Sequence, residues 1–207
     1  MNIVVFGPPL SGKGTLSKNL MNAHGFDGIS TGALLRQEIQ SKSDLGRKIE
    51  PILDQGGLID VDDVIEIISN AYAQRQSQVG VIFDGSPRRV SELYMLLDVI
   101  RADNTHAGID KIIVLDVPED ILFCRMHQRR QEMMARGESP RSDDNESVLK
   151  GRLAKYHAET FPVIEEAEKL GIDIIRIYGD RAPDLVQEDV EYLLGLDDNF
   201  DYAPSLF

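Results

Sequence analysis

A chain of 207 residues with 42% hydrophobic and 28% charged side chains is expected to form one domain, with room for small inserted lobes. Its net charge of −13 argues against binding to nucleic acid or acidic membranes, and no apolar run reaches the roughly 20 residues that a membrane span requires. The single cysteine, Cys124, excludes an internal disulfide, and the amino terminus lacks a signal-peptide pattern, so we expect a cytoplasmic protein.

Apolar runs alternate with helical patterns along the chain. The runs expected to form buried strands are residues 2–6, 79–84, 111–117 and 172–178. The patterns expected to form helices cover about 12–24, 33–41, 45–54, 61–75, 91–100, 119–135, 144–159, 162–170 and 183–194. Uninterrupted apolar strands separated by helices indicate an α/β protein whose parallel sheet is covered on both faces.

The segment GPPLSGKGTL, residues 7–16, follows the first predicted strand and leads into a predicted helix. Glycines let a backbone approach an anion closely, and the N–H groups at a helix amino terminus attract negative charge. Lys13 is placed to reach the β- and γ-phosphates of a nucleotide. The segment therefore predicts a phosphate-binding loop.

Several arginines gather in one region of this acidic chain, which suggests a small anionic ligand. They are Arg125, Arg129, Arg130, Arg136, Arg141 and Arg152. Arg125 and Arg129 are four residues apart and would share one face of a helix. The four histidines show no ligand spacing, so we expect no structural zinc and no metal site built from protein ligands alone.

The pattern Gly-x-x-x-x-Gly-Lys-Gly-Thr in residues 7–15 resembles the phosphate loop of the adenylate kinase family of nucleoside monophosphate kinases. Further segments resemble that family in the same order: STGALLR (30–36), DQGGLI (54–59), DGSPRR (84–89), RSDD (141–144) and GDRAP (179–183). The resemblance implies a three-layer α/β/α P-loop fold with a five-stranded parallel sheet. It also implies a core of residues 1–29, 60–129 and 142–195, a monophosphate-binding lobe at 30–59, a short lid at 130–141 and a tail at 196–207.

The resemblance further implies roles for individual residues. Those expected to be catalytic are Lys13, Arg88, Arg125, Arg141 and Arg152. Those expected to bind ATP are Leu10, Ser11, Gly12, Lys13, Gly14, Thr15, Arg125, Arg129 and Arg181. Those expected to bind the monophosphate are Thr31, Arg36, Gly57, Leu58, Ile59, Gly85, Arg88, Glu92, Arg141 and Arg152. Mg²⁺ would be held by Thr15 and Asp84 through water, and a monomer is expected because the family is mostly monomeric.

Transfer of the ATP γ-phosphoryl group needs these residue types. Charge develops on three equatorial oxygens, so the protein must align two substrates, screen charge and exclude water. The acceptor phosphate is already an oxyanion and needs no general base. Arginine forks bind phosphate with two hydrogen bonds, which fits a site without a catalytic histidine or cysteine. Opening of the lid is expected to limit turnover.

The sequence leaves open which base the acceptor nucleotide carries. Glu92 stands where the family usually has a glutamine that meets adenine, and an ionised carboxylate only accepts hydrogen bonds. Such a group suits guanine or uracil, and Ser86 and Arg89 are polar substitutions nearby. Thr31 and Arg36 keep adenylate kinase character, so AMP is the expected acceptor, with UMP/CMP, GMP or a deoxynucleotide as alternatives.

Two other classes of function compete with phosphoryl transfer. A P-loop ATPase or nucleotide sensor would explain Lys13 and Asp84, but it would leave Arg36, Arg88 and the RSDD motif without a task. A non-catalytic relative is the other alternative, because several family positions are altered. These altered positions are Leu10, Ala33, Ser86 and Glu92.

Overall fold

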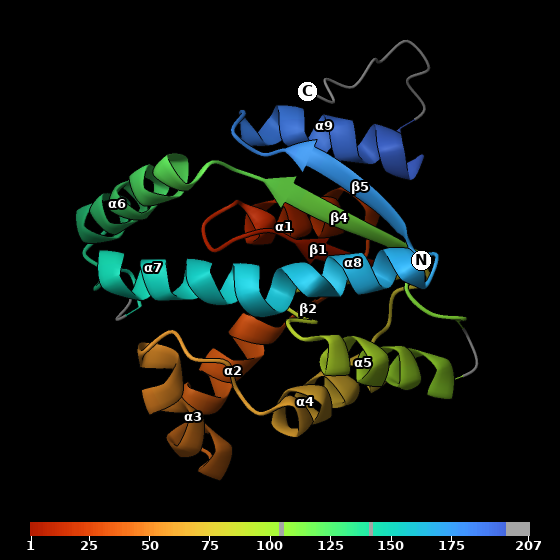
Figure 1. Ribbon diagram of the computed structural model, residues 1–207, viewed down its shortest axis with the longest axis horizontal. Helices are drawn as coiled ribbons and strands as arrows, with labels where there is room; N and C mark the ends of the chain where they lie inside the picture. The colour runs from red at the N-terminus through yellow and green to blue at the C-terminus, as the bar shows by residue number, and fades with distance from the viewer. Residues whose placement is uncertain (104–105, 141–142, 198–207) are drawn as a thin grey trace.

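The computed structural model describes residues 1–103, 106–140 and 143–197, and its centre is a five-stranded parallel sheet (Figure 1). The strands are β1 (Asn2–Phe6), β2 (Asp27–Ser30), β3 (Val81–Asp84), β4 (Lys111–Asp116) and β5 (Asp173–Tyr178). Their order in the sheet is β2-β3-β1-β4-β5, and every pair is parallel. The expected α/β fold with five strands is confirmed.

Alternate residues of β1 point to opposite faces of the sheet. Ile3 and Val5 belong to one apolar cluster, whereas Val4 and Phe6 belong to another, and all four are buried. Both faces are therefore covered, which is why this strand reads as a continuous apolar run.

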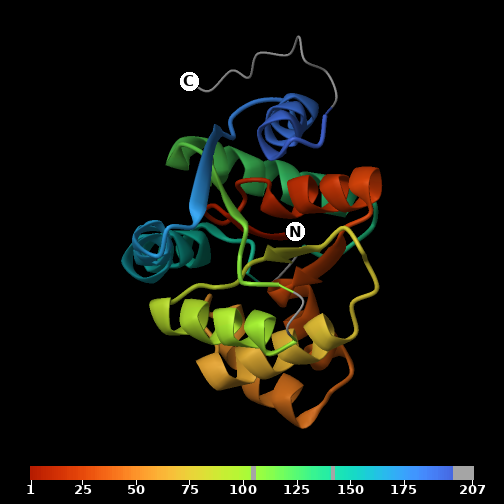
Figure 2. The same ribbon diagram turned by 90° about the vertical axis from the view of Figure 1, so that its right-hand side faces the viewer.

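Helices form a layer on each side of the sheet, as Figures 1 and 2 show. Helices α1 (Lys13–His24) and α9 (Pro183–Leu194) pack together on one face. The helices on the other face and around the site are α2 (Thr31–Gln40), α3 (Asp44–Asp54), α4 (Val61–Ala73), α5 (Val90–Ala102), α6 (Glu119–Ala135), α7 (Glu146–Lys155) and α8 (Phe161–Lys169). Within the part of the chain that the structure describes, no helix is both long and apolar enough to cross a membrane.

The strand β2 was not among the strands predicted from apolar runs in the sequence. Its sequence is DGIS, and only Ile29 is buried. The strand forms because it pairs with β3, where Ser30 stands opposite Asp84 at the carboxyl edge of the sheet. A short polar segment at the edge of a sheet shows no apolar run, so its pairing partner decides its structure.

The two helices expected at 144–159 and 162–170 form one rod in the structure (Figure 1). A π-helical turn, η1 (Tyr156–Thr160), connects α7 directly to α8. Pro162 lies in the first turn of α8, where it lacks an N–H to donate to the preceding turn. Single π-turns inside helices frequently mark functional sites, and this one lies beside the cavity described below.

The segment predicted to be a lid is partly helical. Residues 130–135 form the last turns of α6, and Gly137 then reverses the chain with φ of 74°. Residues 141–142 lie outside the described part. The helices α2 and α3 contact each other and project together from the sheet (Figure 1); they lie within residues 30–59, the range predicted to form the monophosphate-binding lobe. The boundaries of lobe, lid and core stay predictions.

The packing of α2 on α3 makes Gly46 a sensitive position. A Cβ atom there would lie 2.1 Å from the carbonyl oxygen of Glu38, at the end of α2. We expect Gly46→Ala to lower the free energy of unfolding by about 1–3 kcal/mol, because α3 must move away from α2. Urea denaturation measures the change.

Gly151 supplies the matched control, because it lies inside α7 with open space around its Cα. There the same substitution should raise stability by up to about 1 kcal/mol through helix propensity. Equal effects of the two substitutions would contradict the packing argument.

Candidate active site

The phosphate loop folds tightly between β1 and α1. Gly12 precedes the helix with φ of 99°, and Gly7 has φ of 153°. A Cβ atom at Gly7 would lie 2.6 Å from Ser11 Oγ and 3.0 Å from the Leu115 carbonyl oxygen. Only glycine fits there, so the loop can turn back over the end of the sheet and present its amides at the start of α1.

Leu10 takes a left-handed backbone conformation, with φ of 68°. This conformation costs a residue with a side chain roughly 1 kcal/mol. The side chain packs against an apolar cluster under α6 and α7, which offsets that cost. The members of the cluster are Leu122, Met126, Leu149 and Leu153. The substitution of the usual glycine is thus accommodated by packing.

The side chain of Lys13 curls back into the loop. Its Nζ donates to the carbonyl oxygens of Gly7, at 2.7 Å, and of Pro8, at 2.9 Å. Burial lowers the pKa of Lys13 to about 8; Asp84 opposes this shift, while Arg88 and Arg152 add to it. The ammonium group is thus poorly solvated and surrounded by other cations, so an anion would stabilise its charge.

The carboxylate of Asp84 lies at the end of β3, next to the start of α1. Ser30 Oγ donates to Asp84 Oδ2 at 3.3 Å, and a Cβ atom on Gly14 would lie 3.6 Å from the same oxygen. Thr15 is exposed in the same turn of α1. These oxygen ligands fit Mg²⁺, which is commonly held by one or two carboxylates together with substrate phosphates. Among the described residues, no group of three or more His, Cys, Asp or Glu could hold a metal by itself.

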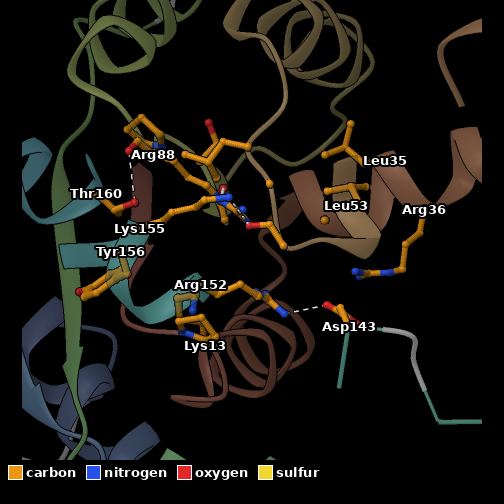
Figure 3. A pocket seen from close by; sticks show the side chains of 18 of the residues that line it. Lys13, Leu35, Arg36, Leu53, Arg88, Asp143, Arg152, Lys155, Tyr156 and Thr160 are labelled. Carbon is orange, nitrogen blue, oxygen red and sulfur yellow. Dashed lines mark hydrogen bonds and ion pairs between the residues drawn. The ribbon is translucent and has the colours of Figure 1, made fainter. Parts of the chain in front are cut away.

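Two cavities adjoin at the carboxyl edge of the sheet. One, of about 380 Å³, lies between the α2–α3 lobe, the turn 85–88 and the rod formed by α7 and η1 (Figure 3). The other, of about 830 Å³, lies between the phosphate loop, α6 and the loop after β5. Residues that line both cavities are Pro9, Lys13, Gly32, Arg36, Gly85, Arg88 and Arg152. Every charged residue in this shared wall is a cation.

Protein oxygens hold the arginines of the shared wall. Arg88 Nε donates to the Gly85 carbonyl at 2.8 Å. Arg152 donates to Asp143 at 2.6 Å, as Figure 3 shows. Burial lowers the pKa of both guanidinium groups, and neighbouring carboxylates partly offset the shift. The partly buried positive charge makes this wall a favourable place for phosphate groups.

The arginines expected on the ATP side line the larger cavity and also have protein partners. Arg125 donates to the Ser11 carbonyl at 3.0 Å and to the Gly179 carbonyl at 2.7 Å, so it joins the phosphate loop to the loop after β5. Arg129 contacts Asp144, and Arg181 contacts the fully buried Asp189. Tertiary contacts hold each guanidinium group at the cavity.

Some of the predicted monophosphate-binding residues lie away from the cavity walls. Thr31 is buried next to Gly85, and its hydroxyl has no hydrogen-bond partner within the described residues. The Ile59 carbonyl accepts from Arg89 at 3.0 Å. Glu92 is buried behind the turn 85–88, and Arg141 lies outside the described part of the chain. Gly57 and Leu58 do line the smaller cavity.

The residues of the smaller cavity that the sequence prediction missed include Lys155, Tyr156 and Thr160 (Figure 3). Lys155 donates to the Gly56 carbonyl at 3.0 Å, and burial raises the pKa of Tyr156 to about 12. Lys155 and Tyr156 follow Arg152 by three and four residues, so helical spacing could have found them. Thr160 had no such signal, because the π-turn changes the spacing.

A glycine-rich loop with a lysine at the first strand-to-helix junction of this parallel sheet, beside a wall of arginines, defines a P-loop nucleotide-binding protein. The family model described as adenylate kinase matches residues 5–172. The chain belongs to the adenylate kinase family, whose members are phosphotransferases that act on nucleoside monophosphates.

Individual relatives agree with this assignment. The adenylate kinase of Phocaeicola vulgatus is 38% identical over 165 residues, which cover 80% of this chain and 83% of the relative. That of Nitrobacter winogradskyi is 37% identical over 194 residues, covering 94% and 93%. That of Agrobacterium fabrum is 33% identical over 194 residues, covering 94% and 97%.

Substitutions at Leu10 test the balance between strain and packing. Leu10→Ala keeps the left-handed backbone strain and loses the packing, whereas Leu10→Gly loses the packing but relieves the strain. We expect Leu10→Ala to be less stable than Leu10→Gly by about 1 kcal/mol in urea denaturation. An alanine variant at least as stable as the glycine variant would show that the backbone is not strained.

The lowered pKa of Lys13 predicts that ATP binding takes up protons near pH 8. Below about pH 8 the ammonium is already charged in the free protein, and above it the bound phosphates must draw a proton onto the side chain. ATP affinity should therefore fall by up to about tenfold between pH 7 and pH 9. Calorimetry at pH 8 in two buffers of different ionisation enthalpy measures the uptake. Lys13→Gln should abolish it, and equal uptake in that variant would assign the proton to another group.

Proposed function

We propose that the protein catalyses the reversible transfer of the γ-phosphoryl group of ATP to AMP, giving two molecules of ADP. The observation that carries this proposal is the wall shared by the two cavities. Lys13, Arg36, Arg88 and Arg152 line both, so the anionic ends of two nucleotides could meet there. A hydrolytic ATPase needs no second cavity with cations of its own.

The smaller cavity suits AMP. Leu35, Ile39 and Leu53 give it apolar lining for a base, and Arg36 and Arg88 supply charge for the phosphate. The buried hydroxyl of Thr31 lies beside Gly85 at the phosphate end. The relatives named adenylate kinase support adenine as the acceptor base.

The larger cavity suits ATP. The residues proposed to bind its phosphates are Leu10, Ser11, Gly12, Lys13, Gly14 and Thr15 in the phosphate loop. Arg125, Arg129 and Arg181 border the same space, from α6 and from the loop after β5. Backbone amides and guanidinium groups in fixed positions stabilise the charge that develops on the transferred group without moving far during the reaction.

Thr15 and Asp84 would hold Mg²⁺ through water. The ion would supply Lewis-acid screening of the phosphate oxygens. The protein itself holds the two substrates in line and excludes water, which would otherwise hydrolyse ATP. We propose that the segment 130–141 closes over the larger cavity for this purpose. The same conformation of that segment with and without a bisubstrate inhibitor would contradict closure.

The arginines contact carboxylates that substrate phosphates could replace. Arg152 donates to Asp143, and Arg129 contacts Asp144, which is 2% exposed. A phosphate offers the same charge-assisted hydrogen bonds as a carboxylate, so the guanidinium groups can exchange partners with little movement. All of these groups come from one chain, so we propose that the enzyme is active as a monomer.

The test is an assay with ATP and Mg²⁺ against AMP, GMP, UMP and CMP, in which diphosphate products are measured. We expect ADP from AMP at the highest kcat/KM. Release of inorganic phosphate without an acceptor would indicate an ATPase, and binding without product would indicate a sensor.

Removal of the positive charge of Lys13 tests whether the phosphate loop contributes to catalysis. Lys13→Ala is expected to lower kcat by at least about 100-fold, because one fixed positive charge at the transferred group is lost. Lys169→Ala is the control, since Lys169 is exposed at the end of α8 and should leave turnover unchanged. Full activity of Lys13→Ala would contradict the proposed site.

A further inference from the structure

We infer that Glu92 is a positioning residue for this reaction: it holds the turn 85–88 so that Arg88 faces the acceptor phosphate, and it does not read the acceptor base. The inference rests on the proposed function. In the family, a glutamine at the position of Glu92 usually contacts the acceptor base, so the resemblance had predicted that Glu92 binds the monophosphate.

The carboxylate of Glu92 is directed into the turn. Glu92 lies in the first turn of α5 and is 4% exposed. The hydroxyl of Ser86, itself 2% exposed, donates to Oε1, and the backbone N–H of Arg88 donates to Oε2 at 3.0 Å. Both carboxylate oxygens therefore already accept hydrogen bonds from the turn.

The backbone of Arg88 is held on two sides. Its N–H donates to Glu92, and its carbonyl oxygen accepts from Thr160 Oγ1 at 3.2 Å (Figure 3). The guanidinium group then bends back, with Nε donating to the Gly85 carbonyl at 2.8 Å. Arg88 lines both cavities, so an anchor on its backbone sets where its charge lies relative to the transferred group.

The surface that faces the acceptor is formed by other residues. Gly85, Ser86, Pro87 and Arg88 line the smaller cavity, and the carboxylate of Glu92 lies behind them. The family usually has phenylalanine and glutamine where this chain has Ser86 and Glu92. A serine hydroxyl can donate to a buried carboxylate and a phenylalanine cannot, so the two substitutions satisfy each other. Loss of Glu92 should therefore affect every acceptor base alike.

The experiment measures kcat/KM for AMP, GMP and UMP, and KM for ATP, in the wild type and in Glu92→Ala. We expect kcat/KM to fall by about 10- to 100-fold for each acceptor, through displacement of Arg88. The ratios between acceptors should change by less than about threefold, and KM for ATP should not change. Glu92→Gln should recover most of the activity, because its amide can accept from the Arg88 N–H and donate to Ser86 Oγ.

Asp27→Ala is the matched control. Like that of Glu92, the Asp27 carboxylate accepts two hydrogen bonds, here from the backbone N–H groups of Gln76 at 2.6 Å and Ser77 at 2.7 Å. It lies at the start of β2 and lines neither cavity. This variant should lose stability and keep the kinetic constants of the wild type. The comparison distinguishes an effect of Glu92 on the position of Arg88 from a general loss of stability.

Three results would overturn the inference. A change of more than about tenfold in the ratio between acceptors would show that Glu92 reads the base. Unchanged kinetics in Glu92→Ala would show that it positions nothing. A wild-type enzyme that phosphorylates no monophosphate would overturn the proposed function and this inference together, whereas the first two results overturn the inference alone.

If Glu92→Ala does not fold, Ser86→Ala provides the second test, because it removes one of the two hydrogen bonds. It should show the same pattern with a smaller loss, about 3- to 10-fold for every acceptor. A loss confined to one base would contradict the inference.

Discussion

The site depends on a cluster of positively charged side chains that are largely buried from water. Lys13, Arg36, Arg88 and Arg152 share the wall between the two cavities, and burial lowers the pKa of Lys13, Arg88 and Arg152. Loop carbonyls and a few carboxylates compensate this charge in part. We propose that phosphate groups complete the compensation, which would let an acidic protein with a net charge of −13 bind highly charged anions at this one place.

The parallel sheet explains how distant segments meet at that point. The phosphate loop follows β1, and Asp84 and the turn that carries Arg88 follow β3, so both lie at the carboxyl edge of neighbouring strands. Ligands of open parallel sheets bind outside this edge. The helices α6 and α7 then bring Arg125, Arg129 and Arg152 across from the other side, and each is oriented by an oxygen of the protein.

Departures from the usual family residues are accommodated by local partners. Leu10 occupies a left-handed conformation that favours glycine, and its side chain packs under α6 and α7. Ser86 and Glu92 form a buried hydrogen-bonded pair that also holds the backbone of Arg88. All three substitutions keep local interactions consistent with the fold, as expected for a sequence that specifies a single structure. None of the three disrupts the shared wall of cations.

The sequence alone determined the parallel α/β fold, the phosphate loop and the family, because β-branched runs, helix periods and a glycine loop with Lys13 are local patterns. It did not reveal β2, since a polar edge strand exists only through its pairing with β3. Nor did it reveal Lys155 and Thr160 at the smaller cavity, the carboxylate partners of Arg129 and Arg152, or the direction of the Glu92 side chain. Tertiary structure decided these features, because the hydrogen-bond partner of a buried polar group is selected by packing between segments far apart in the chain.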